Sequence, residues 1–500
     1  MSRVVLVSNR LPVVAALNGS KIDLVPASGG LAAGLRRLHE ASDGLWIGWP
    51  GDTAQLGARQ RHRLDRMLAD ERLVPVHLDR DAVDAFYHHV ANGVLWPLCH
   101  SLLDRLQPCP QSWQSFCAVS ERFAEAAVAA ARPDDVIWVN DYHLALVPAL
   151  VRERLPEARI GFFLHIPFPS VDIFAALPWR DEFLRGLLGA DVIGFHTPEY
   201  QANFTAALSR LLGAGARDGR ASWQGRRVTI GAFPMGVDAG SWAGRANDPA
   251  TLDQVQMIRK GASGAKILAS VDRLDYTKGI VHRLKVVERL LETYPPLRTQ
   301  IRFIQATVPS REQVASYSEH RRSIDELVGQ INGAFATPEW VPIVNLHRSL
   351  SERELTAIYR AADVMLVTPL RDGMNLVAKE FVASRTDDRG VLILSEFAGA
   401  SSELTEALIV NPFDADGTAR RIVDALEMPP AEQSRRMRAL RRHMVGNDAA
   451  SWAASFLVAV EAQSAGRARL HRVAARAGRS HRTRPARGAS PAAPLRGTNR

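Results

Sequence analysis

Charged and histidine side chains follow several short apolar runs of the sequence, at the points where buried strands would end. Arg10, Asp141 and His165 each stand at the end of a run rich in valine or isoleucine. Ligands bind at the carboxyl ends of parallel strands, so these side chains are placed where a substrate would lie. Singly, His165 is compatible with a core histidine and Asp141 with a helix cap, but their matching position on two strands favours function.

Two groups in the second half of the sequence have the chemistry to bind a diphosphate. Arg273 and Lys278 follow another apolar run, and they offer a forked donor and a compact positive charge. Arg371-Asp372-Gly373 forms a turn before a helical segment, whose first backbone N–H groups suit phosphate. Glu380, one turn inside that helix, is placed to accept hydrogen bonds from ribose hydroxyls.

A glycine pair near the N-terminus is a weaker indication of an anion site. Ser28-Gly29-Gly30-Leu31 opens a predicted helix that runs through Leu38. Glycines allow backbone N–H groups to approach an anion at the positive end of a helix. A glycine pair before a helix is more often only a turn, so Gly29 and Gly30 do not identify a site by themselves.

The elements that would position these residues form two similar series. Short apolar runs alternate with longer helical segments such as Val281–Tyr294, which predicts parallel strands covered by helices on both faces. We therefore expect an α/β fold with two doubly wound domains and an active site between them. The expected strands are Val4–Val7, Val136–Val139, Ile160–His165 and Val192–Phe195, then Ile267–Val271, Ile301–Ile304, Val364–Thr368 and Val391–Leu394.

The length of the chain and a group of proline and glycine residues place the domain boundary near its middle. A chain of 500 residues with 46% hydrophobic composition exceeds one ordinary core. Pro234, Gly236 and Gly240 interrupt the pattern, so we predict an N-terminal domain over residues 1–238 and a C-terminal domain over 239–465. No GxGxxG follows the first strand and no GxxxxGK[ST] occurs, which weighs against a dinucleotide oxidoreductase and a P-loop NTPase.

Composition also predicts a cytoplasmic protein that works away from membranes. No apolar run reaches the ~20 residues that span a bilayer, and the N-terminus enters an apolar strand directly. The three cysteines, Cys99, Cys109 and Cys117, lack CxxC spacing, which indicates a reducing compartment.

The positive charge of the chain lies mostly in a tail. The formal net charge is +9, but residues 466–500 contain ten arginines and no acidic residue, so the rest is nearly neutral. The tail has few large apolar side chains, and we expect it to be disordered. No nucleic-acid partner is expected.

Several motifs in order along the chain resemble the trehalose-6-phosphate synthases. They are Ser-Asn-Arg (8–10), Ser-Gly-Gly-Leu (28–31), Val-Leu-Trp-Pro (94–97), Asn-Asp-Tyr-His-Leu (140–144), His-Ile-Pro-Phe-Pro (165–169), Asp-Arg-Leu-Asp-Tyr-Thr-Lys-Gly (272–279) and the stretch 367–380. The resemblance runs from residue 3 to about residue 460. Those proteins are retaining glycosyltransferases of the GT-B architecture, in which two Rossmann-like domains face a central cleft.

The resemblance implies a role for each matching residue. The acceptor, glucose 6-phosphate, would meet Arg10, Tyr87, Trp96, Asp141 and Arg311. A nucleoside-diphosphate glucose donor would meet Gly29, Gly30, Arg273, Lys278, Leu350, Asp372, Gly373, Met374, Asn375, Leu376, Val377 and Glu380. The catalytic residues would be His165, Arg273, Lys278 and Asp372.

We expect neither a metal nor another cofactor, because cations and helix amides would stabilise the leaving diphosphate. Asp79-Arg80-Asp81 has the DxD spacing of metal-dependent transferases but stands in a charged loop. A double-displacement glycosidase would need two carboxylates about 5 Å apart, and the ribose role of Glu380 removes one of the pair.

The sequence leaves several properties open. Leu350 stands where the family often has an aromatic residue, so UDP-, ADP- and GDP-glucose all remain donors to test, with UDP-glucose preferred. Rival functions are a relative with another phosphorylated acceptor, a pseudoglycosyltransferase, and a non-catalytic sugar-phosphate sensor. We recognise no second, phosphatase-type module in the sequence, so we expect the product to keep its phosphate. A homo-oligomer is neither indicated nor excluded.

Overall fold

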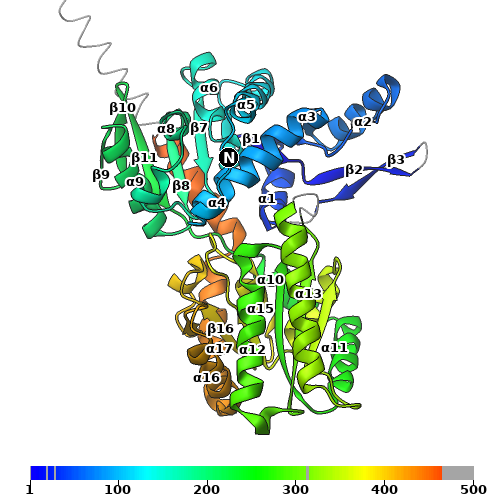
Figure 1. The fold of residues 1–500 in the computed structure, drawn as a ribbon. Coiled ribbons are helices and arrows are strands. Elements are labelled where there is room, and N and C mark those ends of the chain that lie inside the picture. The colour runs from blue at the N-terminus through cyan, green and yellow to red at the C-terminus, as the bar shows by residue number, and fades with distance from the viewer. Residues whose placement is uncertain (1, 19–20, 28–29, 54, 311–314, 464–500) are drawn as a thin grey trace, which may run out of the picture.

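Two α/β bodies lie one above the other in Figure 1, each built around its own sheet. The structure is a computed structural model and describes residues 2–18, 21–27, 30–53, 55–310 and 315–463. Within these residues, no helix is both long enough and apolar enough to cross a bilayer.

The first sheet has the strand order β5-β4-β1-β6-β7-β8-β11-β10-β9. It is parallel from β5 to β11, and β10 and β9 continue it as an antiparallel edge. A separate hairpin of β2 and β3 projects from this body (Figure 1). The strands are β1 (Val4–Arg10), β2 (Val13–Asn18), β3 (Lys21–Pro26), β4 (Leu45–Trp49), β5 (Leu73–Pro75), β6 (Val136–Asn140), β7 (Arg159–Phe163), β8 (Val192–Phe195), β9 (Gly215–Arg217), β10 (Arg220–Trp223) and β11 (Arg226–Ala232).

Helical elements connect these strands and cover both faces of the sheet. They are α1 (Gly30–Ala41), α2 (Ala58–Asp70), α3 (Arg80–Val83), the π-helix η1 (Asp84–Leu95), α4 (Trp96–Cys99), η2 (Leu103–Arg105), α5 (Pro110–Ala130), η3 (Tyr142–Leu144), α6 (Val147–Arg154), α7 (Val171–Phe174), α8 (Arg180–Leu187) and α9 (Pro198–Leu211). Side chains of β1 alternate between two cores, with Val5 and Val7 in one and Val4 and Leu6 in the other. A strand buried on both faces explains the unbroken apolar run in the sequence.

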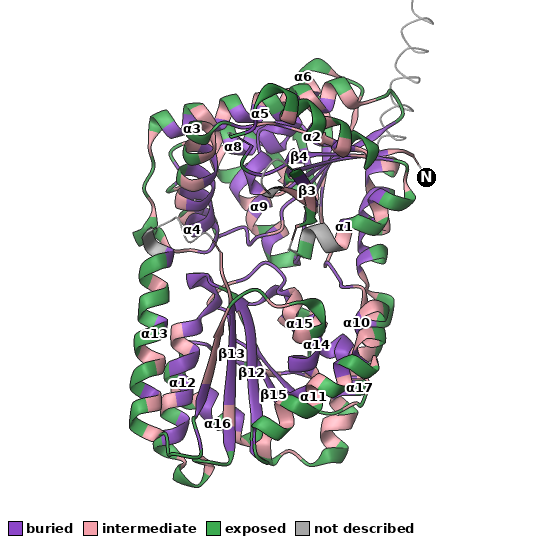
Figure 2. Ribbon diagram, turned by 90° about the vertical axis from the view of Figure 1, so that its right-hand side faces the viewer, coloured by how far each residue is buried: buried purple, intermediate pink, exposed green. Residues whose placement is uncertain are grey.

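The second sheet is parallel, with the order β14-β13-β12-β15-β16-β17. Figure 2 shows its buried strands β12, β13 and β15 at the centre of the second body. The strands are β12 (Lys266–Arg273), β13 (Ile301–Val308), β14 (Ile343–His347), β15 (Val364–Val367), β16 (Val391–Ser395) and β17 (Leu408–Val410).

Two helix layers cover this sheet. One layer, with α12 (Ile280–Thr293), α13 (Ala315–Phe335) and α16 (Ala415–Glu427), packs in the core that contains Leu268. The other packs in the core that contains Ile267 and Ala269; its helices are α10 (Ala239–Ala246), α11 (Pro249–Gly261), α14 (Glu352–Ala361), α15 (Leu376–Ser384) and α17 (Pro430–Gly446). Three short 3-10 helices complete the body: η4 (Tyr276–Lys278), η5 (Pro295–Leu297) and η6 (Gly399–Ser402).

After α17 the chain returns to the first body. Residues 449–463 are helical, and Trp452, Phe456 and Val460 pack in the first sheet's second core. The sheet accommodates this helix because Gly161 carries no side chain: a Cβ atom there would lie 2.7 Å from the Phe456 ring. The last helix thus packs with the N-terminal strands, although the predicted range 239–465 contains it. The boundary at residue 238 stays a prediction.

Each sheet has a switch point, from which consecutive strands run outward in opposite directions, and predicted site residues lie there. In the first sheet the chain runs outward from β1 through β4 to β5, then restarts at β6 on the other side of β1. In the second sheet it runs from β12 through β13 to β14 and restarts at β15. Doubly wound sheets bind ligands at such switch points. Arg10 and Asp141 end or follow β1 and β6, and Arg273 ends β12.

Candidate active site

Lys278 and Asp372 form an ion pair at the switch point of the second sheet. Nζ of Lys278 lies 2.5 Å from Oδ2 of Asp372, and both residues are buried. Lys278 ends η4, and Gly279 behind it has φ +68°, where a Cβ atom would also lie 2.5 Å from the Thr368 carbonyl oxygen. Glycine therefore lets the lysine segment approach the end of β15.

The turn between β15 and α15 is held by its own side chains. Oδ1 of Asp372 accepts a hydrogen bond from the Gly373 N–H, and Oδ2 accepts one from the Asn375 amide. Asn375 has φ 67°, and its side chain accepts from the Ala378 N–H at the start of α15. This left-handed conformation is uncommon for a non-glycine residue and is characteristic of strained functional sites. The Gly373 N–H, predicted to be open to phosphate, is bonded to Asp372 here.

The surroundings of Asp372 keep its carboxylate ionised. Burial alone would raise its pKa, but the Lys278 ammonium and the Asn375 amide outweigh burial, and the pKa lies below its usual value. The tyrosine hydroxyl of Tyr200, in α9 of the first body, donates to the Asp372 carbonyl oxygen at 2.9 Å. Asp372 is therefore a fixed negative charge at the boundary between the two bodies, which we call the interdomain boundary.

Arg273, at the end of β12, faces the first body. Its guanidinium carbon lies 5.8 Å from the ring centre of Trp96, which is the first residue of α4. A second contact of this kind joins Arg105 to Tyr276, at 4.4 Å. Cations over aromatic rings attract each other and hold the two bodies in register at this edge.

Glu380 lies in α15, four residues after the first residue of the helix. The Tyr359 hydroxyl donates to its Oε2 at 2.8 Å. Burial raises the pKa of Glu380 to about 7, although the Tyr359 hydrogen bond lowers it. Its charge therefore changes near neutral pH, which is unusual for a carboxyl group.

The other predicted donor residues lie around the same helix. Met374 is buried, and Leu376 and Val377 pack on the core of the second body that contains Ile267 and Ala269. Leu376 also meets the first body, because a Cβ atom on Gly30 would lie 2.5 Å from its Cδ1. Leu350 follows β14, at the carboxyl edge of the same sheet.

On the side of the first body, the exposed residue Arg10 lies against two aromatic rings. Its guanidinium carbon lies 5.1 Å from the ring centres of both Trp49 and Tyr87. Tyr87 stacks on His143, with ring centroids 5.7 Å apart. Trp49 was not predicted from the sequence, although it ends β4 and is the register partner of Arg10. An arginine held on aromatic faces is well oriented to bind a phosphate.

Asp141 and His165 meet at the ends of β6 and β7. Oδ1 of Asp141 accepts the His165 backbone N–H at 3.1 Å, and Asp141 has φ 75°. Strand β7 ends at Phe163 rather than at the predicted His165, because the chain there turns to bond this carboxylate.

The ring of His165 is neutral and oriented by Asn140. The Asn140 amide nitrogen donates to the Trp138 carbonyl oxygen, so its Oδ1 faces Nε2 of His165 at 3.1 Å and Nε2 carries the proton. Burial, with a smaller effect of His196, lowers the pKa of His165 well below its usual value. His165 is therefore a neutral imidazole that forms hydrogen bonds, and it is not an imidazolium ion that acts as a general acid.

The His165 loop also touches the Asp372 turn. A Cβ atom on Gly373 would lie 2.2 Å from the His165 carbonyl oxygen, so glycine is required for this approach. Predicted residues from both halves of the chain thus meet at the interdomain boundary. Gly29 and Arg311 lie outside the described residues.

Among the described residues, no cluster of three or more histidine, cysteine or acidic side chains has the arrangement of a metal site. Asp79 of the DxD sequence is the N-cap of α3 and accepts the Ala82 N–H at 2.8 Å. The metal-free reaction stays a prediction.

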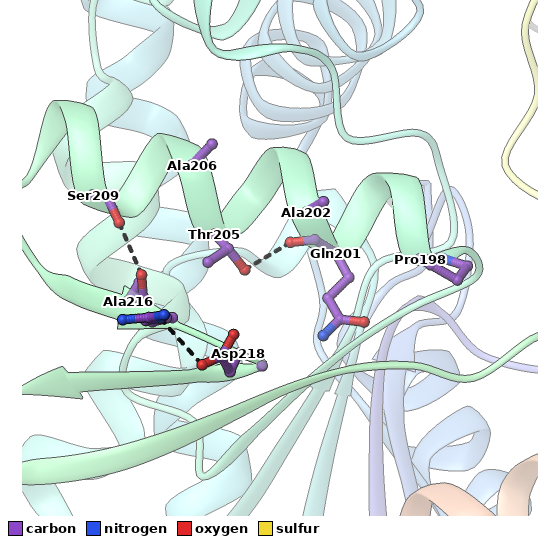
Figure 3. A pocket seen from close by; sticks show the side chains of 10 residues that line it. Pro198, Gln201, Ala202, Thr205, Ala206, Ser209, Ala216 and Asp218 are labelled. Atoms are coloured by element: carbon purple, nitrogen blue, oxygen red, sulfur yellow. Dashed lines mark hydrogen bonds and ion pairs between the residues drawn. The ribbon is translucent and has the colours of Figure 1, made fainter.

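A cavity of about 470 Å³ lies elsewhere on the first body. Figure 3 shows it between α9 and the β9–β10 hairpin, lined by Gln201, Thr205 and Asp218 among others. It contains none of the predicted site residues, and the charged residues in its lining, Arg217 and Asp218, pair with each other.

The chain is similar to known glycosyltransferases over almost its whole length. The family model described as glycosyltransferase family 20 matches residues 2–462. The trehalose-6-phosphate synthase of Mycolicibacterium smegmatis is 42% identical over 472 residues, covering 92% of each chain. The bifunctional trehalose-6-phosphate synthase/phosphatase of Thermoproteus tenax is 43% identical over 475 residues, which are 93% of this chain but only 64% of that protein.

One solved structure is similar to this chain both in fold and in sequence. It is the α,α-trehalose-phosphate synthase (UDP-forming) of Burkholderia xenovorans in complex with glucose-6-phosphate. The TM-score is 0.82 at 34% identity, and the match covers 92% of this chain and 100% of that one. The α/β architecture with two Rossmann-like bodies is therefore that of the GT-B enzymes. The chain belongs to glycosyltransferase family 20.

Proposed function

We propose that this protein is a retaining glucosyltransferase that makes α,α-trehalose 6-phosphate from UDP-glucose and glucose 6-phosphate. The observation that carries this proposal is the meeting of two different groups at one boundary. Lys278, Asp372 and Arg273 approach from the second body, and Trp96 and His165 from the first. Arg10 ends β1 at the switch point of the first sheet.

The second body supplies what a nucleotide-sugar donor needs. Lys278 and Arg273 offer two cations to a diphosphate that gains charge as its bond to glucose breaks, and such preorganised groups stabilise the transition state. Asp372 holds Lys278 in place and presents a carboxylate to the hydroxyls of the transferred glucose. Glu380 is positioned to accept hydrogen bonds from the ribose.

The first body supplies what a sugar phosphate needs. Arg10, held between Trp49 and Tyr87, binds the phosphate, and Trp96 forms a wall against the hexose ring. Asp141, whose Oδ1 accepts the His165 backbone N–H, accepts a hydrogen bond from an acceptor hydroxyl in this proposal. Arg311 joins the acceptor phosphate in this proposal.

Attack occurs on the same face from which UDP leaves, which accounts for retention. The acceptor hydroxyl forms the new bond to the anomeric carbon as the bond to the diphosphate oxygen breaks, and the leaving phosphate takes the acceptor's proton. No side chain need act as a nucleophile. UDP-glucose is preferred as donor because the similar Burkholderia enzyme is UDP-forming.

The remaining parts of the proposal concern the cellular compartment and the role of each domain. We infer a cytoplasmic enzyme whose partners are its two substrates, with N-terminal residues 1–238 binding the acceptor and residues 239–465 the donor.

An assay of the purified protein tests this function against its rivals. Glucose 6-phosphate is supplied with UDP-, ADP- or GDP-glucose, and release of the nucleoside diphosphate is measured with and without acceptor. The proposal predicts rapid UDP release only when glucose 6-phosphate is present. Turnover with another phosphorylated acceptor alone indicates a different transferase, and tight sugar-phosphate binding without turnover indicates a sensor.

A further inference from the structure

His100 is a buried polar side chain that the reaction described above does not use. It is 3% exposed and directly follows α4. Its Nδ1 lies 2.7 Å from the Trp96 carbonyl oxygen, and its ring lies on the Trp96 indole with centroids 4.2 Å apart. His100 is therefore fixed against the residue that forms the proposed acceptor wall.

The bond to Trp96 determines which ring nitrogen carries the proton. A carbonyl oxygen only accepts hydrogen bonds, so Nδ1 is protonated and Nε2 of the neutral ring carries a lone pair. Burial lowers the pKa of His100 to about 4, although the Trp96 carbonyl raises it. Near neutral pH, Nε2 is therefore a hydrogen-bond acceptor.

This acceptor has no partner within the described part of the chain. Nε2 of His100 is buried and makes no hydrogen bond there. Buried polar atoms are rarely left unpaired, and a binding site is one place where a ligand completes them. The charged groups that act on the ring are Asp275, Asp372 and Lys278, all from the second body. The His100 ring thus packs on Trp96 and lies on the side of the first body that faces the second.

We propose that Nε2 of His100 accepts a hydrogen bond from a hydroxyl group of one of the two hexoses when both substrates are bound. The inference rests on the proposed function. A hydroxyl is the matching partner because it can donate a hydrogen bond, whereas ionised phosphates and carboxylates only accept. His100 then helps to determine which sugars react, as a residue that contacts substrate.

Two substitutions separate this role from the structural bond to Trp96. In His100→Asn the short amide reaches the position of Nδ1, so the bond to the Trp96 carbonyl is kept and the substrate contact is lost. In His100→Gln the longer amide reaches the position of Nε2, so its oxygen can accept the sugar hydroxyl while the bond to Trp96 is lost.

The two variants are compared with the wild type by melting temperature and by kcat/KM for both substrates. His100→Asn should melt near the wild type and lose roughly tenfold in kcat/KM, the effect of one unmade hydrogen bond. His100→Gln should melt lower and keep most of the activity. His39→Asn is the control, because His39 is also buried and lies near a backbone carbonyl oxygen, that of Arg72. It should lower the melting temperature only.

Monodeoxy analogues of glucose 6-phosphate and of UDP-glucose identify the hydroxyl. For the analogue that lacks it, wild type and His100→Asn should react equally, and the substrate that contains it follows directly. The inference is overturned if the wild type is active and His100→Asn keeps its full kcat/KM. It is also overturned if the two proteins differ in kcat/KM with every monodeoxy analogue. A wild type that makes no trehalose 6-phosphate overturns the proposed function, and this inference with it.

Discussion

Nζ of Lys278 lies 2.5 Å from Oδ2 of Asp372, although the two residues belong to different loops of the second sheet. Lys278 follows β12 and Asp372 follows β15, the two strands between which the strand order reverses. The pair keeps the ammonium oriented at the place where a diphosphate would leave. Such preorganised charge lowers the barrier because nothing has to reorient during the reaction.

Replacing Lys278 by methionine should therefore depress kcat, because methionine keeps most of the unbranched stem and removes the ammonium group with its charge and its donors. A loss of ~100-fold or more is expected, as for other single groups that stabilise transition-state charge. Steady-state kinetics with both substrates measure it.

Arg10→Ala is the matched comparison on the acceptor side, and it should mainly raise KM for glucose 6-phosphate. Calorimetry without acceptor should show that this variant binds UDP-glucose normally. Lost donor affinity in Arg10→Ala, together with full turnover in Lys278→Met, would contradict our division of the two phosphate sites.

Glu380 should make donor binding depend on pH around neutrality. Burial raises the pKa of this carboxyl to about 7, and only the ionised form accepts hydrogen bonds from both ribose hydroxyls. Affinity for UDP should rise severalfold between about pH 6 and pH 8. The Glu380→Gln variant is the control, because UDP itself also titrates there, and the part of the pH dependence that disappears in it belongs to Glu380.

The same shift has the opposite effect on the stability of the free protein. The folded pKa lies above the unfolded value of 4.5, so the contribution of Glu380 is present below about pH 4.5 and is lost as the pH rises through 7. The melting temperature of Glu380→Gln minus that of the wild type should therefore be larger at pH 8 than at pH 5. An equal difference in melting temperature between variant and wild type at the two pH values would refute the assigned pKa.

The reaction should proceed without a divalent metal ion. Lys278 and Arg273 supply the positive charge that a metal provides in other transferases. Excess EDTA should leave the initial rate nearly unchanged. A loss of rate that Mg²⁺ or Mn²⁺ restores would show that the two cations do not suffice.

The returning helix at 449–463 should contribute to the stability of the first body. Phe456 is fully buried against Phe163 and Trp138, so Phe456→Ala should cost about 3–5 kcal/mol. Denaturant unfolding measures this cost. Val458→Ala on the same helix is the control, because Val458 is 63% exposed and its loss should be small. Equal effects of the two substitutions would show that the helix does not pack on the sheet as described.

The central strands could be predicted from the sequence because they are buried on both faces. Val4–Val7 and Ile267–Val271 were found as apolar runs, the second interrupted by Ser270, and the structure extends each by a few residues. The edge strands were missed, and so were the interior strands β4 and β11. β5 and β17 contain three residues each, too few for a pattern, and β9 and β10 belong to a short antiparallel edge.

The site residues were predicted from strand ends and from the family resemblance, and their geometry came only from the structure. Sequence placed Lys278 and Asp372 near a diphosphate but gave no reason to pair them, because a contact between two loops depends on the order of the strands. Trp49, Asn140, Tyr200 and His100 were not given roles. Their functions depend on neighbours distant in sequence, although Trp49 could have been suspected from its place at a strand end beside Arg10.

The central claim is transfer of glucose with retention from UDP-glucose to glucose 6-phosphate. The most direct measurement is a ¹³C NMR spectrum of the product made from UDP-glucose labelled at the anomeric carbon. The account predicts that the label appears in an α,α-linked disaccharide phosphate while UDP is released in equal amount. A β linkage, or labelled free glucose as the main product, would contradict it.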